Sequence, residues 1–375
     1  MTNKGEHIKV IISGGGTGGH IYPAIAIADA LKDMDSETEI LFVGAEGKME
    51  MEKVPQAGYN IKALPVSGLQ RKLTLKNLSV PFKLLKSLNE AGRIINGFQP
   101  DVVVGVGGYA SAPVLRKAQN KKIPTLIQEQ NGYAGLTNKM LSSKAAKICV
   151  AYPGMEQYFP KNKIMFLGNP VRKDIGSLDK LKAEAFEYFN LDPEKPVVLS
   201  IGGSLGARTI NEGLLSIYKN LLDRGIQLIW QTGKFYYESI KQQLDSEAKG
   251  LWVNAFISRM DLAYACADMV VSRAGALSIS ELCLAGKPAI LIPSPNVAED
   301  HQTKNAMALV KEDAAVMLSD SETKLKLQDE IIDLVENEDK KNQMIQNIKK
   351  LAKPHAAMDI AKEIVKLTSD KMKMA

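Results

Sequence analysis

The sequence predicts an α/β protein of two domains, each built on a doubly wound parallel sheet. Two glycine-rich turns support this prediction, GGGTGGH at residues 14–20 and GGSLGA at residues 202–207. Each turn follows a β-branched apolar run and precedes apolar residues at helical spacing, which is the order of strand, turn and helix. A chain of 375 residues is long enough for two such domains.

Apolar runs in the first half predict strands that alternate with helices. The predicted strands cover residues 9–13, 39–43, 101–106, 125–128 and 147–151, and the first predicted helix covers residues 21–31. Alternation of this kind favours a parallel sheet with helices on both faces.

The second half repeats the pattern. Its predicted strands cover residues 197–201, 227–231, 251–255, 269–272 and 289–292, with a helix at 209–222. Between the halves, Gly168 and Pro170 would break any helix or central strand. We therefore expect domains at 1–167 and 168–353, with the helix predicted for 354–375 packed back on the first domain.

The composition excludes several classes of protein. The 45% apolar and 24% charged residues are typical of a soluble globular chain. The three cysteines are scattered, without the spacing of a disulfide framework or a zinc site. The uncharged stretch at residues 102–115 is too short to span a bilayer, and the N-terminus does not resemble a signal peptide. We expect a cytoplasmic protein that is not integral to a membrane.

The net charge of +6 is concentrated in the first half, where residues 1–170 hold 21 Lys and Arg against 13 Asp and Glu. Residues 68–88 combine cations and apolar side chains and contain no acid. This stretch could dock on an anionic lipid surface, or it could be an amphipathic helix packed on its own sheet. The candidate membrane residues are Leu75, Leu78, Phe82, Lys83, Leu85 and Lys86. Nucleic acid is not expected as a partner, because basic and aromatic residues are not interleaved.

The first glycine turn fits more than one kind of phosphate site. Gly14, Gly16 and Gly19 match the dinucleotide fingerprint, which also needs an acidic residue at the end of the second strand to bind a ribose. The nearest acidic residue, Glu46, lies beyond the end of that strand, so the match is weak. A Walker-A loop would need lysine where His20 stands. A neutral imidazole at a helix N-terminus could act as a base, although a capping or core histidine is the alternative.

The second glycine turn also matches the nucleophile elbow of serine hydrolases. Ser204 would be the nucleophile, with His301 or His355 as base. An elbow does not explain a second glycine turn in the other half of the chain. We therefore favour Ser204 as a phosphate ligand.

Residues 269–293 predict a strand, a turn, a helix and another strand. The helix N-terminus at Ala276 and Leu277 is a second seat for an anion, and Glu281 lies in the first turns of that helix. Its carboxylate could accept hydrogen bonds from two ribose hydroxyls, or it could be a solvated surface group. Farther on, Gln302 could bind sugar hydroxyls. The D-x-D at Asp33 and Asp35 falls at a helix end, and no metal is assigned to it.

Seven motifs together resemble the MurG-type glycosyltransferases, which add N-acetylglucosamine (GlcNAc) to lipid I to make lipid II for peptidoglycan. They fall in the family's order and spacing over nearly the whole chain. The motifs are GGGTGGH, GVGGYASAP, EQNGYAGLTNK, GNPVR, GGSLGA, SRAGALSISE and HQTKNA. The resemblance implies a GT-B architecture of two Rossmann-like domains with the active site in the cleft between them. It also implies an inverting transfer without metal or cofactor.

The resemblance implies roles for individual residues. The donor UDP-GlcNAc would contact Thr17, Gly18, Gly19, Asn131, Arg172, Ser204, Ile257, Ala276, Leu277, Ser278, Ile279, Ser280, Glu281 and Gln302. The acceptor would contact Gly16, His20, Tyr109, Glu129 and Asn131, with His20 the candidate base and Glu281 on the ribose.

The implied partners are UDP-GlcNAc, lipid I and the anionic inner leaflet of the cell membrane, and cell-wall synthesis proteins stay open as partners. Three alternative functions stay open: another GT-B enzyme with a different sugar or acceptor, a dinucleotide-dependent oxidoreductase, or a serine hydrolase.

Overall fold

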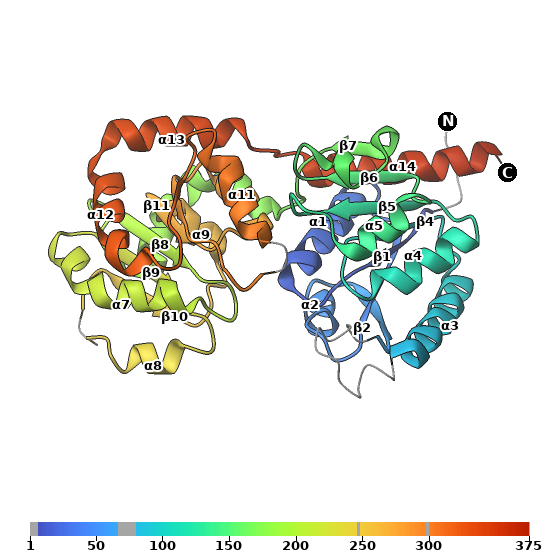
Figure 1. Ribbon diagram of the computed structural model, residues 1–375, viewed down its shortest axis with the longest axis horizontal. Coiled ribbons are helices and arrows are strands. Elements are labelled where there is room, and N and C mark those ends of the chain that lie inside the picture. The colour runs from blue at the N-terminus through green and yellow to red at the C-terminus, as the bar shows by residue number, and fades with distance from the viewer. Residues whose placement is uncertain (1–6, 67–79, 246–247, 298–299, 375) are drawn as a thin grey trace. The chain divides into compact units, whose positions relative to one another are not determined.

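The computed structural model describes residues 7–66, 80–245, 248–297 and 300–374, the side chains of 80–84, 173–174, 176–177 and 370–374 excepted. The chain forms two compact units (Figure 1). Unit 1 comprises Met1–Arg172 and His355–Ala375, and unit 2 comprises Lys173–Pro354. Each unit contains one parallel sheet, so the predicted fold class of two doubly wound α/β domains is confirmed.

Unit 1 has a seven-stranded parallel sheet in the order β3-β2-β1-β4-β5-β6-β7. Its strands are β1 (Lys9–Ser13), β2 (Glu39–Ala45), β3 (Asn60–Leu64), β4 (Val102–Gly105), β5 (Thr125–Glu129), β6 (Lys147–Val150) and β7 (Ile164–Phe166). Its helices are α1 (Gly18–Met34), α2 (Glu50–Gln56), α3 (Val80–Phe98), α4 (Ser111–Asn120), α5 (Leu136–Ser142), α14 (Ala356–Met374) and the short 3₁₀ helices η2 (Met155–Gln157) and η3 (Lys161–Lys163).

Helices cover both faces of this sheet because successive strand residues point to opposite sides. Ile11 and Val103 face the core layer formed with α3, α4 and α5. Val10 and Val104 face the other layer, formed with α1 and α14. The C-terminal helix α14, red in Figure 1, packs against α1 although more than 300 residues separate them in the chain.

Unit 2 has a six-stranded parallel sheet in the order β10-β9-β8-β11-β12-β13. Its strands are β8 (Val197–Ile201), β9 (Gln227–Gln231), β10 (Leu251–Asn254), β11 (Met269–Ser272), β12 (Ala289–Leu291) and β13 (Val316–Met317). Its helices are η4 (Lys173–Leu181), α6 (Lys182–Phe189), α7 (Arg208–Asp223), α8 (Tyr237–Lys241), α9 (Met260–Cys266), α10 (Ala276–Ala285), α11 (His301–Val310), α12 (Thr323–Glu336) and α13 (Glu338–Lys350).

The sheet of unit 2 also lies between two helical layers. Leu199 and Val270 belong to the core cluster with α6, α9 and α10. Val198 and Val271 belong to the cluster with α7 and α12. The fully buried Trp230 adds the largest side chain to this second cluster, and its indole N–H donates to Oδ1 of Asn211 at 2.9 Å.

Three strands are absent from the sequence prediction: β3, β7 and β13. All three lie at sheet edges and only one of their residues, Leu64, is buried. An edge strand has one hydrogen-bonded neighbour and an exposed side, so it lacks the continuous apolar run that reveals a central strand.

Candidate functional site

Both glycine turns lie where the strand order of a sheet reverses. The first glycine loop, residues 14–19, runs from the end of β1 into the first two residues of α1, and β1 pairs with β2 on one side and β4 on the other. The second glycine loop, residues 202–207, joins β8 to α7, and β8 lies between β9 and β11. Ligands of doubly wound sheets bind at such switch points, outside the carboxyl ends of the strands.

The first glycine loop positions the imidazole of His20. Nδ1 lies 3.1 Å from the carbonyl oxygen of Gly15 and 3.3 Å from Oγ1 of Thr17. Since a carbonyl only accepts, Nδ1 carries the proton and Nε2 bears the lone pair; this tautomer is assigned from its partners. The residue keeps some exposed surface, yet protein atoms surround the ring. This burial lowers the pKa of His20 below its ordinary 6.5, against the charges of Glu129 and Glu50, which raise it.

The ring of His20 packs against the backbone after β4. A Cβ atom added to Gly107 would lie 2.9 Å from both Cδ2 and Nε2 of the ring, and Gly107 has φ +96°. Only glycine fits this position without displacing the imidazole. The neighbouring Tyr109 is 59% exposed and lies near the end of the same connection, two residues before α4.

Glu129 ends β5 and is buried, and its carboxylate is engaged by the loop that follows. Oε2 accepts from the Gly135 amide and from Nδ2 of Asn138, both at 2.9 Å, and Oε1 accepts from the Asn131 amide at 3.2 Å. These bonds fix the loop that carries the half-buried Asn131. The sequence indicated Glu129 and Asn131 but not Asn138.

Arg172 is the last residue of the connection between β7 and η4. Its guanidinium lies 5.6 Å from the ring centroid of Tyr22 in α1, a cation–π distance. The same connection is tied to β5 by Asn169, whose Nδ2 donates to the Gln130 carbonyl at 3.0 Å. Unit 1 therefore brings His20, Glu129 and Asn131 to the carboxyl ends of β1 and β5.

A hollow of about 640 Å³ lies at the switch point of unit 2. Its walls include the second glycine loop, Ser278 in the first turn of α10, and Gln302 in α11. The amino ends of α7 and α10 both meet it, and the first N–H groups of a helix have no partner within that helix. Gln302 is held there by the Ser294 amide, which donates to its Oε1 at 2.8 Å. Ser204 is exposed at the tip of the second glycine loop.

An ion pair between Arg273 and Asp320 lies at the wall of the hollow. Nη1 of Arg273, directly after β11, donates to Oδ1 of Asp320 at 2.5 Å and to the carbonyl oxygens of Ile292 and Pro293. Oδ2 of Asp320 accepts from the Thr209 hydroxyl at 2.6 Å. These bonds join the start of α7 to the segments that follow β11, β12 and β13, although sequence reasoning did not single out either Arg273 or Asp320.

Two further predicted donor residues are Glu281, which is part of α10, and Ile257, which lies just before α9 in the chain. The hydroxyl of the fully buried Tyr264 donates to Oε2 of Glu281 at 3.2 Å. The buried Ile257 donates its backbone amide to Oε1 of Gln231 at the end of β9. Of the predicted donor residues of unit 2, Ser278 and Gln302 line the hollow. Ala276 and Ile279 are themselves buried, whereas Leu277, Ser278 and Ser280 are half-exposed.

The membrane candidates lie mostly outside the described side chains. Leu75 and Leu78 fall outside the described residues, and the side chains of Phe82 and Lys83 in α3 are likewise not described. Leu85 is 61% exposed and Lys86 is exposed. Among the described residues, no helix is long and apolar enough to cross a bilayer. Residues 7–66, 80–245, 248–297 and 300–374 also contain no cluster of His, Cys, Asp and Glu suited to a metal ion.

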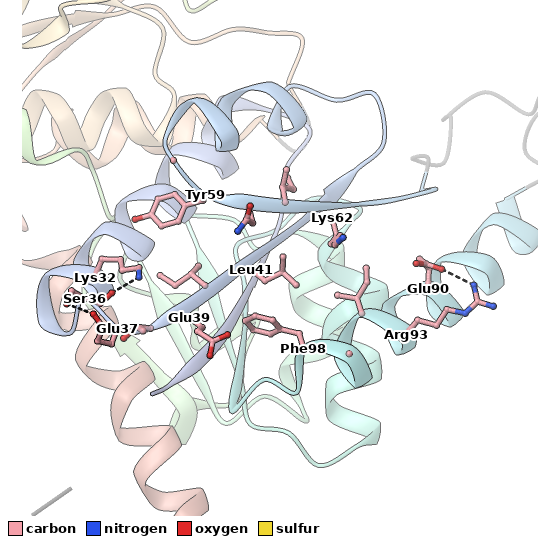
Figure 2. A pocket seen from close by; sticks show the side chains of 17 residues that line it. Lys32, Ser36, Glu37, Glu39, Leu41, Tyr59, Lys62, Glu90, Arg93 and Phe98 are labelled. Atoms are coloured by element: carbon pink, nitrogen blue, oxygen red, sulfur yellow. Dashed lines mark hydrogen bonds and ion pairs between the residues drawn. The ribbon is translucent and has the colours of Figure 1, made fainter. Parts of the chain in front are cut away.

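Another hollow, of about 890 Å³, lies at the amino ends of β2 and β3 beside α3 (Figure 2). Figure 2 shows charged side chains on its walls, among them Lys32 near Ser36 and an ion pair between Glu90 and Arg93 at 3.2 Å. Because ligands of such sheets bind at the carboxyl ends, this hollow is separate from the candidate site.

These features define the class of protein. Two parallel-sheet units, each with an anion-binding glycine loop at its switch point, are typical of enzymes that bind nucleotides and their phosphates. Comparison with known families is more specific. Residues 10–150 match the glycosyltransferase family 28 N-terminal domain, and residues 197–364 match the glycosyltransferase family 28 C-terminal domain. The chain belongs to glycosyltransferase family 28, and it is neither a serine hydrolase nor an oxidoreductase.

Relatives match over almost the whole chain. A protein of Parabacteroides distasonis is 52% identical over 97% of this chain and 99% of its own length. A protein of Flavobacterium psychrophilum is 53% identical over 96% of this chain and 98% of its own length. Both are named UDP-N-acetylglucosamine--N-acetylmuramyl-(pentapeptide) pyrophosphoryl-undecaprenol N-acetylglucosamine transferase. The crystal structure of Acinetobacter baumannii MurG superposes with a TM-score of 0.74 at 29% identity, covering 96% of this chain and 99% of that one.

Proposed function

We propose that the chain transfers GlcNAc from UDP-GlcNAc to the muramyl 4-hydroxyl of lipid I, undecaprenyl-diphospho-N-acetylmuramoyl-pentapeptide, and so forms lipid II for peptidoglycan. The observation that carries the proposal is the pair of switch-point sites, one around His20 and one at the hollow of unit 2, in a chain of family 28. The names of the full-length relatives supply the two substrates. Cell shape and cell division depend on this product through the wall.

Unit 2, which covers most of the predicted domain 168–353, is proposed to bind the donor. The N-termini of α7 and α10 and the hydroxyl of Ser204 would hold the diphosphate in or beside the hollow. Glu281 would accept hydrogen bonds from the ribose hydroxyls, and Ile257 would contact the uracil. Gln302 would bind the GlcNAc hydroxyls, since its side chain is already fixed at the wall of the hollow.

Unit 1 is proposed to bind the acceptor and supply the base. The muramyl hydroxyl attacks the anomeric carbon on the face opposite UDP, so the configuration inverts. The new C–O bond forms as the bond to UDP breaks, and the hydroxyl proton moves to Nε2 of His20. Gly16, Tyr109 and Glu129 would surround the acceptor. Thr17, Gly18, Gly19, Asn131 and Arg172 would approach the donor sugar.

The proposed reaction needs no metal ion and no cofactor, with UDP-GlcNAc as a substrate. The leaving diphosphate carries negative charge, and backbone N–H groups at helix N-termini can stabilise that charge in place. The Ser204 hydroxyl adds a further donor.

The enzyme is further proposed to act as a peripheral protein at the cytoplasmic face of the cell membrane, where a lipid-linked acceptor is available. The basic excess of residues 1–170 and the exposed Leu85 and Lys86 support docking on anionic lipid. Packing of the stretch at 68–88 on its own sheet is the other outcome.

Incubation with UDP-GlcNAc and a lipid I analogue in detergent tests the proposed function. We expect a product heavier by one GlcNAc and an equal amount of UDP. UDP-glucose as donor, and a muramyl peptide lacking the lipid diphosphate as acceptor, should react much more slowly. Equal use of all donors and acceptors would point to another family 28 reaction.

A further inference from the structure

A buried acidic residue, Glu50, contacts the first glycine loop. The sequence drew attention to Glu46, which is exposed, whereas Glu50 is only 1% exposed. Glu50 is the first residue of α2, and its side chain extends under the loop that joins β1 to α1. A buried carboxylate is costly unless its oxygens are hydrogen-bonded, so its partners reveal its role.

Both carboxylate oxygens accept hydrogen bonds from backbone amides. The amide of Gly16 donates to Oε2 at 2.9 Å, and the amide of Ala45 donates to Oε1 at 2.9 Å. Glu50 therefore joins the end of β2 to the middle of the first glycine loop.

Two glycines make room for this side chain. A Cβ atom on Gly15 would lie 2.1 Å from Oε1 of Glu50, and a Cβ atom on Gly44 would lie 2.5 Å from its Cγ. Any side chain at either position would push the carboxylate out of place. The local sequence is thus built around a carboxylate at this point.

The contact with Gly16 reaches His20 through a single peptide group. The N–H of that peptide belongs to Gly16 and donates to Glu50, and its C=O belongs to Gly15 and accepts from Nδ1 of His20. A peptide fixed at its N–H by a carboxylate has a fixed plane, so its carbonyl oxygen is fixed as well. Hydrogen bonds in such a chain also polarise one another.

We propose that Glu50 is a positioning residue that orients His20 through the peptide between Gly15 and Gly16. The carboxylate holds this peptide so that its carbonyl keeps the proton on Nδ1 and leaves the lone pair on Nε2 as the base. Glu50 acts without touching a substrate. The consequence for catalysis rests on the proposed function, whereas the effect on the tautomer does not.

The test replaces the carboxylate and reads the tautomer directly. In Glu50→Gln, one side of the amide can only donate, so it opposes one of the two backbone N–H groups. The chain has four histidines, and ¹⁵N spectra of histidine-labelled protein report the tautomer of each, with His20→Gln assigning the signal. We expect wild-type His20 to carry its proton on Nδ1 and the Glu50→Gln variant to show a mixture of tautomers.

Kinetics supply the second readout. We expect kcat of Glu50→Gln to fall about tenfold or more, the effect of one hydrogen bond to a charged group. The dissociation constant for UDP should not change, because the proposed donor site belongs to unit 2. Glu52→Gln is the matched control, since Glu52 lies on the same helix but is exposed and pairs only with its neighbours in the described structure.

Gly44→Ala is a second variant should Glu50→Gln fail to fold, because it displaces the carboxylate while keeping its charge. A wild-type tautomer and kcat in the folded variants would overturn the proposal, and a merely structural role would lower Tm without altering either. If the wild-type enzyme does not transfer GlcNAc to lipid I, the proposed function fails, and the tautomer of His20 still decides the role of Glu50.

Discussion

The hydroxyl of Tyr264, on α9, donates a hydrogen bond of 3.2 Å to Oε2 of Glu281, on α10. Tyr264 is fully buried, whereas Glu281 is half-buried in the second turn of its helix. The buried tyrosine therefore helps to fix the position of this carboxylate. A fixed carboxylate is suited to accept hydrogen bonds from a ribose.

Replacement of this carboxylate should impair use of the donor. We expect Glu281→Ala to lower kcat/KM for UDP-GlcNAc about 10- to 100-fold, because hydrogen bonds to a charged group contribute about 1.5–3 kcal/mol. Tyr264→Phe should cost about two- to tenfold, since the carboxylate remains but loses one contact. Steady-state kinetics with varied UDP-GlcNAc measure both. Glu238→Ala, on the exposed face of α8, is the control, and unchanged turnover in Glu281→Ala would contradict the donor site.

Activity should fall on the acid side of the pKa of His20. Burial lowers this pKa below 6.5, so the neutral ring persists to lower pH than in a free histidine. Protonated His20 cannot accept the hydroxyl proton, and the acid limb of kcat/KM should therefore lie below pH 6.5. His20→Gln should lose about 10²- to 10⁴-fold in kcat and show no such limb, whereas His7→Gln, at an exposed position, should keep it. A limb that survives in His20→Gln would exclude His20 as the base.

The same pKa shift predicts a change in stability with pH. Between 6.5 and the lowered pKa, the unfolded chain binds a proton at His20 and the folded chain does not, so the free energy of unfolding declines as pH falls. Thermal unfolding of the wild type and His20→Gln, compared from pH 8 to 5, isolates this contribution. The wild type should lose more Tm than the variant on acidification; parallel curves would contradict the shift.

Gly107 should be needed for the position of His20. In Gly107→Ala the new methyl group would lie about 2.9 Å from the ring, and displacement of the base should lower kcat about 10- to 100-fold. Gly58→Ala is a matched control, because Gly58 has φ +85° but no atom within 4 Å of its Cβ position. Both variants should lose a similar amount of Tm from backbone strain, and only Gly107→Ala should lose kcat. Equal kcat in the two variants would refute the contact.

The ion pair of Arg273 and Asp320 should stabilise the donor hollow. Both side chains are partly buried, with 16% and 29% exposure, and Asp320 also holds Thr209. We expect Arg273→Met and Asp320→Asn each to reduce the rise in Tm that UDP produces, and to show coupling in the double variant. The exposed pair of Lys326 and Glu322 serves as the control, and its loss should leave the rise in Tm that UDP produces unchanged and cost little stability. Additive effects on UDP would show that the pair does not act as a unit.

Binding to anionic vesicles should depend on the lysines of α3. Lys83→Glu with Lys86→Glu should weaken sedimentation with phosphatidylglycerol vesicles about tenfold or more, because each lysine near such a surface contributes about 1 kcal/mol. The charge-matched control is Lys241→Glu with Lys249→Glu, at exposed positions of unit 2. Equal binding by the two double variants would assign the stretch at 68–88 to packing on its own sheet.

The sequence predicts the centre of each sheet better than its edges. The strands β1 and β8 are buried apolar runs followed by glycines, and their predicted bounds match the structure. The edge strands β3 and β13 are short and partly exposed, so their residues resemble loops or the ends of helices.

Some residues of the candidate site can likewise be predicted from the sequence, and others cannot. His20 and Glu281 follow glycine turns at helix starts, and this local pattern is visible in the sequence. Glu50 and Arg273 act through contacts with residues 34 and 47 positions away, at Gly16 and Asp320. Contacts at that separation depend on which strands are neighbours, and strand order is not written in any local pattern.

The product of the reaction tests the central claim most directly. Enzyme, UDP-GlcNAc and a lipid I analogue are incubated with excess EDTA, and the linkage in the purified product is determined by NMR. We predict a β-linked GlcNAc on the 4-hydroxyl of the muramyl residue, formed at the same rate with and without EDTA. An α-linkage, a different hydroxyl or loss of turnover in EDTA would contradict an inverting, metal-independent transfer to the muramyl 4-hydroxyl.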